Sequence, residues 1–163
     1  GHHGVTTVPS TLFPTSFALA GAFDLNLADR VYSAIADEAK AMNIRHLLSP
    51  PVPNLVRDPR WGRTEETFGE DVFLTSRMAV AAARPFCDRG IVTSTKHFVA
   101  NYGDGGRDSA AVYFSERELR EYWLAPFEAA IVEGGSLGLM PAYNSVNGLP
   151  MHANGFLLND KRS

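Results

Sequence analysis

The chain has 163 residues, of which 45% are hydrophobic and 20% charged, and a formal net charge of −3. This composition is that of an ordinary soluble globular protein, and no apolar run is long enough to span a bilayer. The small negative charge provides no basic field, so neither nucleic acid nor a membrane is an expected partner. The single cysteine, Cys87, cannot form an internal disulfide and leaves the redox compartment open.

The first half of the chain shows two helical patterns and two short apolar runs. Hydrophobic periodicity predicts a helix over residues 26–42, with Asn26 as its N-cap. A strand is predicted at 45–48, and a long polar loop then extends to Asp71. The next helix is predicted over 72–89 and closed by Gly90 at the C′ position. A second strand is predicted at 91–95.

The second half repeats this order after another polar loop. Ser115 and Glu118 have the spacing of a capping box, which predicts the start of a helix. This helix should extend to Glu133 and kink or restart at Pro126, because proline lacks a backbone N–H. A third strand is predicted at 137–140, and a last helix from about Gly155.

The alternation of strand, loop and helix predicts an α/β fold with parallel strands and crossover helices. Three strands spaced by roughly 46 residues fit consecutive βα units, but a complete eightfold barrel needs about 250 residues. We therefore predict a partial TIM-type (β/α) barrel with parallel strands and long βα loops. A small doubly wound, flavodoxin-like domain is the alternative, although loops as long as 50–71 and 96–114 favour a site above the strands.

Both ends of the sequence read as cut, because the chain begins at Gly1 and a helical pattern that has just begun stops at Ser163. We expect residues 1–163 to be a single-domain fragment of a larger barrel. An unclosed barrel exposes edge strands, so the isolated chain is expected to aggregate or dimerise. The lack of a signal peptide carries no weight at such a start.

Hydrogen-bond donors and aromatic residues gather where the predicted strands end, which is where α/β folds carry their sites. They lie in residues 57–63, in residues 96–98, and at Tyr143 and Asn144. Donors and rings around a weakly polar ligand suit a sugar, whose hydroxyls need many hydrogen bonds. Residues 103–106 (GDGG) do not match the dinucleotide-binding fingerprint.

Several segments in register resemble glycoside hydrolase family 3, and together they cover essentially the whole chain. They are residues 57–71 (RDPRWGRTEETFGED), 96–98 (KHF), 115–120 (SERELR), 140–150 (MPAYNSVNGLP), and His3-Gly4-Val5 followed by Phe13-Pro14. The resemblance implies the N-terminal (β/α)8 barrel of a retaining β-glucosidase or β-xylosidase. Such an enzyme releases terminal non-reducing β-D-glucosyl or β-D-xylosyl residues from a small carbohydrate substrate, and it needs no cofactor.

The same resemblance implies a sugar-binding role for four residues. Arg63, Lys96 and His97 match donors to sugar hydroxyls, and Tyr143 matches a tyrosine near the nucleophile. The family's aspartate nucleophile and its acid/base would lie beyond the last residue, so no catalytic residue is assigned within the chain. The family resemblance implies secretion or a periplasmic location. The alternative function is a non-catalytic carbohydrate-binding remnant of the same barrel.

Other polar residues have plainer interpretations. Family members that cleave β-N-acetylglucosamine carry an Asp-Ser-His element, and here Asp108-Ser109-Ala110 lacks the histidine. His2 and His3 are weak evidence for metal binding, and we predict no metal site. Structural ion pairs or helix starts are expected from the charged residues of the long loop, namely Arg57, Asp58, Arg60, Glu65, Glu66, Glu70 and Asp71. Trp61 and Phe98 are expected to pack in the core.

Lys96 and His97 raise a geometric problem, because adjacent residues of a regular strand point to opposite faces. Both can face one ligand only where the backbone departs from strand geometry. We therefore predict an irregular backbone at residues 96–98, such as a strained or cis peptide.

Overall fold

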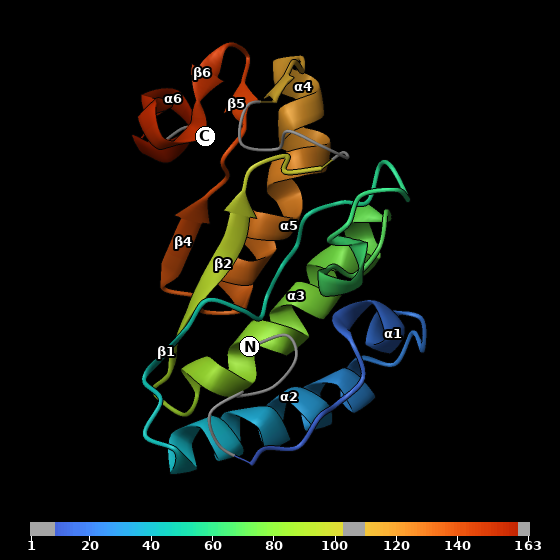
Figure 1. The fold of residues 1–163 in the computed structure, drawn as a ribbon, viewed down its shortest axis with the longest axis vertical. Helices are drawn as coiled ribbons and strands as arrows, with labels where there is room; N and C mark the ends of the chain where they lie inside the picture. The colour runs from blue at the N-terminus through green and yellow to red at the C-terminus, as the bar shows by residue number, and fades with distance from the viewer. Residues whose placement is uncertain (1–8, 103–109, 160–163) are drawn as a thin grey trace.

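The structure is a computed structural model that describes residues 9–102 and 110–159. Its main sheet has three parallel strands in the order β1-β2-β4 (Figure 1): β1 (His46–Leu47), β2 (Val92–Phe98) and β4 (Gly138–Pro141). The three strands thus lie side by side in the order in which they occur in the chain. A doubly wound sheet reverses its order at a switch point, whereas a β/α barrel does not. The predicted partial barrel is confirmed in its parallel strands and their chain order.

The longer helices pack against one another in chain order. A short α1 (Ser16–Ala20) precedes α2 (Leu25–Ala41), which packs against α3 (Val72–Cys87), and α3 packs against α5 (Ala125–Glu128). The expected N-cap of α2 is wrong, because Asp24 rather than Asn26 caps it and accepts a 2.9 Å hydrogen bond from the N–H of Leu27. Phe23 has a φ of 51°, which turns the chain between α1 and α2 and lets the helix begin earlier.

The two ends of α3 form as the sequence indicates. Asp71 caps its first turn by accepting a 2.6 Å hydrogen bond from the N–H of Leu74. At the other end Gly90 has a φ of +72° and donates to the carbonyl of Cys87, while Ile91 donates to the carbonyl of Phe86. This pair of bonds is a Schellman motif with Gly90 at C′. The motif directs the chain straight into β2.

The third helical region is interrupted, as its proline predicts. Ser115 accepts a hydrogen bond from the N–H of Glu118 and caps α4 (Glu116–Glu118). A π-helical segment, η2 (Leu119–Leu124), then leads to α5, where Pro126 stands in the first turn, and to a second one, η3 (Ala129–Glu133). A proline at that position has no N–H for an α-helical bond to the preceding turn, and the wider turn before it accommodates the loss.

A second small sheet was not anticipated from the sequence. It comprises β3 (Ala111–Val112), β5 (Ser145–Val146) and β6 (Leu149–Pro150), in the order β3-β5-β6. Asn147 and Gly148 connect β5 to β6 with φ angles of 51° and 83°, the Asn-Gly pattern of a two-residue hairpin. A 3₁₀ turn, η4 (Met151–Ala153), and α6 (Gly155–Asn159) follow.

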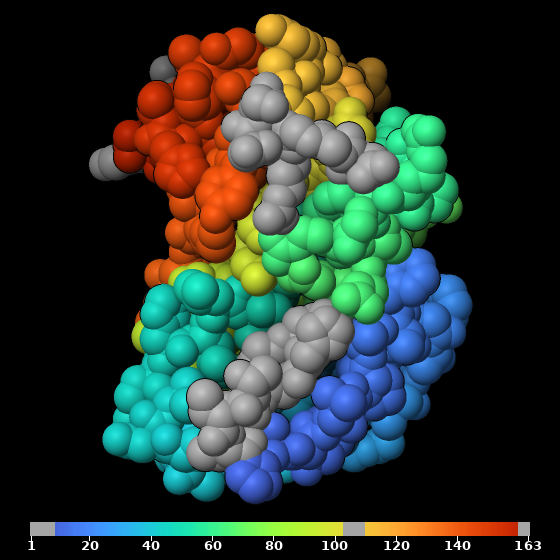
Figure 2. All heavy atoms as spheres, viewed as in Figure 1, coloured from blue at the N-terminus to red at the C-terminus, as the bar shows by residue number. Residues whose placement is uncertain are grey.

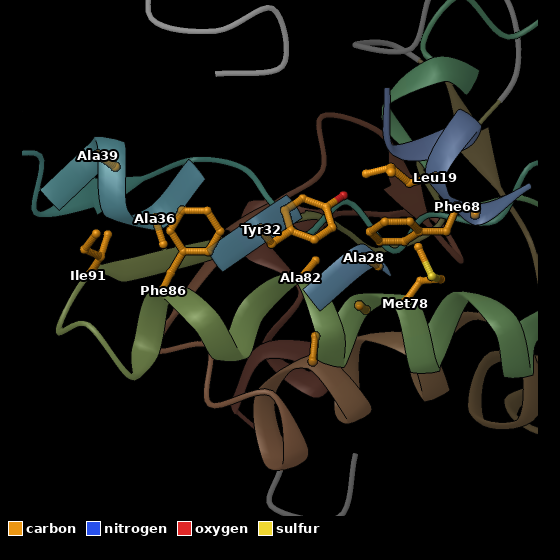
Figure 3. Close-up of a cluster of buried hydrophobic side chains, with 13 residues drawn as sticks. Leu19, Ala28, Tyr32, Ala36, Ala39, Phe68, Met78, Ala82, Phe86 and Ile91 are labelled. Carbon is orange, nitrogen blue, oxygen red and sulfur yellow. The ribbon is translucent and has the colours of Figure 1, made fainter. Parts of the chain in front are cut away.

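Two hydrophobic clusters hold these layers together. One lies between α2 and α3, where Tyr32, Phe86 and Ile91 pack (Figure 3). The other joins the end of β2 to the interrupted helix and the C-terminal segments through Phe98, Trp123 and their neighbours. In the space-filling view the N-terminal helices (blue) form one end of the molecule and the C-terminal segments (orange and red) form the other (Figure 2).

Candidate functional site

The backbone at the end of β2 is irregular, as predicted. The peptide bonds Lys96–His97 and Phe98–Val99 are both cis. Lys96 is paired with Met140 on β4 and Phe98 with Pro141, so the register shifts between them. Two residues of β2 therefore correspond to one residue of β4, which is the count of a β-bulge. This arrangement departs from the strict alternation of side chains along a strand.

The long loop after β1 brings Arg63 to this bulge. Trp61 is buried, and its carbonyl accepts hydrogen bonds from the N–H and the hydroxyl of Thr64, at 3.1 and 2.8 Å. These bonds fold the loop into a 3₁₀ turn, η1 (Thr64–Glu66), which Arg63 precedes. Trp61 and Phe98 are both core residues, so the expectation that they pack rather than form exposed sugar platforms is confirmed.

Arg63 and Lys96 converge on one carboxylate, and His97 joins this cluster through Arg63. Arg63 donates from Nη2 to Oε2 of Glu66 at 2.7 Å and from Nε to Oε1, in the two-pronged geometry that suits a guanidinium. Nζ of Lys96 lies 3.6 Å from Oε2 of Glu66. Nη1 of Arg63 donates to Nε2 of His97 at 2.8 Å. Three of the four predicted binding residues thus meet at the carboxyl end of β2.

Glu66 is held as a carboxylate in this cluster. Its side chain is only 12% exposed, and burial by itself would raise its pKa. The hydrogen bond from Arg63 and the charges of Arg63 and Lys96 outweigh burial, so the pKa of Glu66 is lowered. Glu66 therefore neutralises an arginine, as predicted for the acidic residues of this loop. Two cations, Arg63 and Lys96, thus face one anion.

Asn54 is a residue of the site that the sequence reasoning missed. It lies in the buried segment 52–56, and its own side chain is 1% exposed. Its Nδ2 donates to the carbonyl of His97 at 2.9 Å, and its Oδ1 accepts from the N–H of His97 at 2.7 Å. A single amide within an otherwise apolar run, Val-Pro-Asn-Leu-Val, is the signal that could have identified it.

Tyr143 lies after β4, at the same end of the sheet. Its side chain is 46% exposed, and its ring stacks with that of His152 at a centroid distance of 6.4 Å and an interplanar angle of 17°. Neighbouring Asn144 is buried and donates to the carbonyl of Val99 at 3.3 Å, which fastens this loop to the bulge of β2. The structure therefore brings Arg63, Lys96 and His97 together and places Tyr143 on the adjacent strand end.

The remaining charges of the loop have structural roles. Arg60 and Asp58 form an exposed pair at 2.6 Å. Hydrogen bonds from the side chain and the backbone of Arg60 lower the pKa of Asp58 to about 2. Arg57 was expected to form an ion pair, but it lies over aromatic rings instead. Its guanidinium carbon is 5.1 Å from the ring centre of Tyr122 and 6.0 Å from that of Trp123. It ties the loop to the π-helical segment through cation–π contacts.

Some predictions fall outside the described residues, namely those on His2, His3, Asp108 and Ser109. In residues 9–102 and 110–159, no helix is both long and apolar enough to cross a membrane. The same part of the chain shows no group of three or more histidine, cysteine or acidic side chains placed to hold a metal ion.

Comparison with known proteins agrees with this geometry. Residues 1–161 match the model of the "Glycosyl hydrolase family 3 N terminal domain". The chain is 39% identical to β-glucosidase B of Emericella nidulans over 94% of this chain and 18% of that protein. It is 37% identical to a β-xylosidase of Formosa agariphila over 93% of this chain and 22% of that protein.

Solved structures show the same relationship. A β-glucosidase from Streptomyces venezuelae, crystallised in complex with D-glucose, superimposes with a TM-score of 0.91 at 36% identity, over 98% of this chain and 20% of that one. The chain thus spans about a fifth of the length of the relatives it matches. The family that the motifs of the long loop and of the Lys-His-Phe segment indicate is confirmed, and the chain belongs to glycosyl hydrolase family 3, in the N-terminal domain of that family.

Proposed function

We propose that the complete protein containing this chain is a β-glycosidase that releases terminal non-reducing β-D-glucosyl or β-D-xylosyl residues. One observation carries the proposal: Arg63 and Lys96 meet at Glu66 at the carboxyl end of β2, and Arg63 also bonds to His97. These are the residues for which the family resemblance implies contacts to sugar hydroxyls. The names of the relatives, β-glucosidase and β-xylosidase, support this substrate class.

The chain contributes binding and orientation to this reaction. Arg63 and Lys96 present N–H groups that carry positive charge, and such donors form stronger hydrogen bonds than neutral ones. The cluster is held before any sugar arrives, because Glu66 fixes Arg63 and Asn54 fixes His97. Donors that are already oriented lose less entropy when the sugar binds and keep its reacting carbon in place.

Glu66 itself is unsuited to be the nucleophile or the acid/base. Both of its oxygens accept hydrogen bonds from Arg63, and its lowered pKa keeps it unprotonated. A general acid for glycoside cleavage needs a raised pKa, and a nucleophile needs a free oxygen facing the sugar. Glu66 is therefore left with a binding role, and the two catalytic carboxyl groups, about 5 Å apart as retention requires, are other residues of the complete protein.

A second candidate is a carbohydrate-binding protein without hydrolytic activity. The same cluster supports it, because binding needs the donors and does not need the nucleophile. The two candidates differ only in whether a bound glycoside is turned over.

The test compares the 163-residue chain with the complete protein on nitrophenyl β-D-glucoside and nitrophenyl β-D-xyloside. Nitrophenyl α-D-glucoside serves as the control for anomeric selectivity. We expect hydrolysis of a β-glycoside by the complete protein only, and the preferred substrate identifies the sugar. Glucose binding without turnover in the complete protein would support the binding protein instead. Activity of the isolated chain would show that one of its own carboxylates is catalytic.

A further inference from the structure

The side chain of Asn54 takes over the backbone pairing of His97. The segment after β1 lies against the end of β2, where the N–H of Lys96 donates to the carbonyl of Pro51 at 3.3 Å. One residue farther along, Asn54 bonds both to the N–H and to the carbonyl of His97, at 2.7 and 2.9 Å. A side-chain amide thereby does what a neighbouring strand does in a regular ladder. The backbone position of His97 depends on this one amide.

The two ring nitrogens of His97 have partners that define the proton position. Nε2 lies 2.8 Å from Nη1 of Arg63, and a guanidinium nitrogen can only donate. Nε2 is therefore the acceptor and carries no proton. Nδ1 lies 3.3 Å from Oδ1 of Asn54, an oxygen that can only accept. These two partners fit the neutral tautomer with its proton on Nδ1.

The contact with Arg63 disfavours the charged form of the ring. His97 is 2% exposed, and an imidazolium would place a second cation against the guanidinium of Arg63. Glu66 is engaged by Arg63 and Lys96. The amide oxygen of Asn54 accepts from Nδ1–H without the negative charge that would draw a second proton onto the ring.

We propose that Asn54 is a positioning residue of the sugar site, which holds His97 as the neutral Nδ1–H tautomer. Nε2 is then an acceptor, for a donor group of Arg63 or for a sugar hydroxyl. Because Nη1 of Arg63 bonds to Nε2, the same tautomer also orients Arg63, whose other nitrogens face Glu66. The role in sugar binding rests on the proposed function. The tautomer itself does not depend on it.

The chain offers a matched control for the bridging amide. Asn147 accepts a 2.8 Å hydrogen bond from the N–H of Phe114 and donates to the carbonyl of Phe114 at 3.0 Å. This is the same bridge across one residue, but it lies in the exposed β5–β6 hairpin and its target is not a histidine. Replacing either asparagine by aspartate keeps the acceptor oxygen and removes the donor. Only at position 54 does the change also place a carboxylate against an imidazole.

The test uses the complete protein with Asn54→Asp, with Asn147→Asp, and with His97→Gln alone and combined with Asn54→Asp. We expect Asn54→Asp to raise KM for the cleaved nitrophenyl glycoside by about tenfold or more. An imidazolium cannot accept at Nε2, so the hydrogen bond from the charged Arg63 to His97 is lost. Asn147→Asp should change KM by less than about twofold, because it touches no group of the cluster. In the His97→Gln background, Asn54→Asp should add less than about twofold, because its effect passes through His97.

Ring nitrogen resonances provide a readout that a purely structural role would not move. In protein labelled with ¹⁵N-histidine, the signals lost in His97→Gln identify His97. We expect the neutral Nδ1–H pattern in the unmodified protein and a shift towards imidazolium in Asn54→Asp. An imidazolium or an Nε2–H tautomer at His97 in the unmodified protein would overturn the proposal, whether or not Asn54→Asp folds.

The proposed function and the positioning role of Asn54 can be contradicted separately. If the complete protein neither cleaves nor binds a glycoside, the proposed function is wrong, and the ring resonances still decide the tautomer. If it cleaves a glycoside but Asn54→Asp behaves like Asn147→Asp, or keeps its full effect without His97, the positioning role of Asn54 is wrong.

Discussion

Arg63 and His97 are 34 residues apart in the chain, yet Nη1 of Arg63 donates to Nε2 of His97 at 2.8 Å. The contact joins the loop after β1 to the bulge at the end of β2. Two successive βα units thus contribute side chains to one site, at the end of the sheet where barrels of this type carry their chemistry. Glu66 completes the arrangement by holding the other two nitrogens of Arg63.

Arg63→Lys should weaken sugar binding even though the charge remains. A lysine cannot donate to both oxygens of Glu66 and to His97 at once, because it lacks the planar fork of a guanidinium. We expect kcat/KM of the complete protein to fall by about 10- to 100-fold, the effect of losing one or two charged hydrogen bonds. Arg60→Lys in the same loop is the control, since its pair with Asp58 is exposed. Equal kinetic effects of the two variants would contradict the assignment.

Glu66→Gln should change how stability depends on pH. The pKa of Glu66 is lowered in the folded protein, so its contribution is present above the unfolded value of about 4.3 and is lost as the pH falls through the folded value. The difference in unfolding free energy between the two proteins should therefore be largest near pH 7 and shrink below about pH 4. Thermal or urea unfolding from pH 3 to 7 measures this difference.

The control for Glu66 is Glu121→Gln, because Glu121 forms an exposed pair with Arg117 on the helix surface. Its effect on stability should be small at every pH. A stability difference for Glu66→Gln that stays constant down to pH 3 would show that the carboxylate is not favoured by its neighbours.

Gly138→Ala should destabilise the sheet. A Cβ at this position would overlap Oγ of Ser94 and would lie 2.9 Å from the carbonyl oxygen of Thr93. The clash involves the backbone of β2, so we expect a loss of about 1–3 kcal/mol in urea unfolding. Gly155→Ala is the matched control, because the nearest atom to its Cβ is Nδ2 of Asn159 at 3.8 Å. Unfolding midpoints that agree for both variants would be inconsistent with close packing of β2 and β4.

Tyr143→Phe should separate a chemical role from a structural one. The side chain is 46% exposed, so removing the hydroxyl should leave the unfolding midpoint nearly unchanged. If the hydroxyl bonds near the nucleophile, as the family resemblance implies, kcat should fall by about tenfold with a smaller change in KM. Steady-state kinetics of the complete protein measure both constants. Unaltered kcat would remove Tyr143 from the site.

The elements of the barrel could be predicted because their signals are local. Gly90 ends α3, Ser115 caps the next helix, and Pro126 interrupts it, each through its own backbone geometry. The start of α2 was misplaced because Asp24 and Asn26 are both good caps, and only the turn at Phe23 decides between them. The hairpin at Asn147-Gly148 also has a local signal, because an Asn-Gly pair favours a two-residue turn between strands.

The site was only partly predictable, for a physical reason. Arg63, Lys96 and His97 could be named from motifs, and the adjacency of Lys96 and His97 correctly required an irregular backbone. Asn54 acts on His97 through the path of the segment after β1, across 43 residues of sequence. Such a contact depends on how the loop packs against β2 and leaves no periodic pattern in the chain.

The central claim is that Arg63, Lys96 and His97 form a subsite for a terminal sugar. A crystal structure of the complete protein soaked with D-glucose tests it most directly. We predict glucose hydroxyls within about 2.7–3.2 Å of nitrogen atoms from all three side chains, with Nε2 of His97 accepting from glucose in place of Nη1 of Arg63. Glucose bound away from these residues, or a subsite filled by other side chains of the protein, would contradict it.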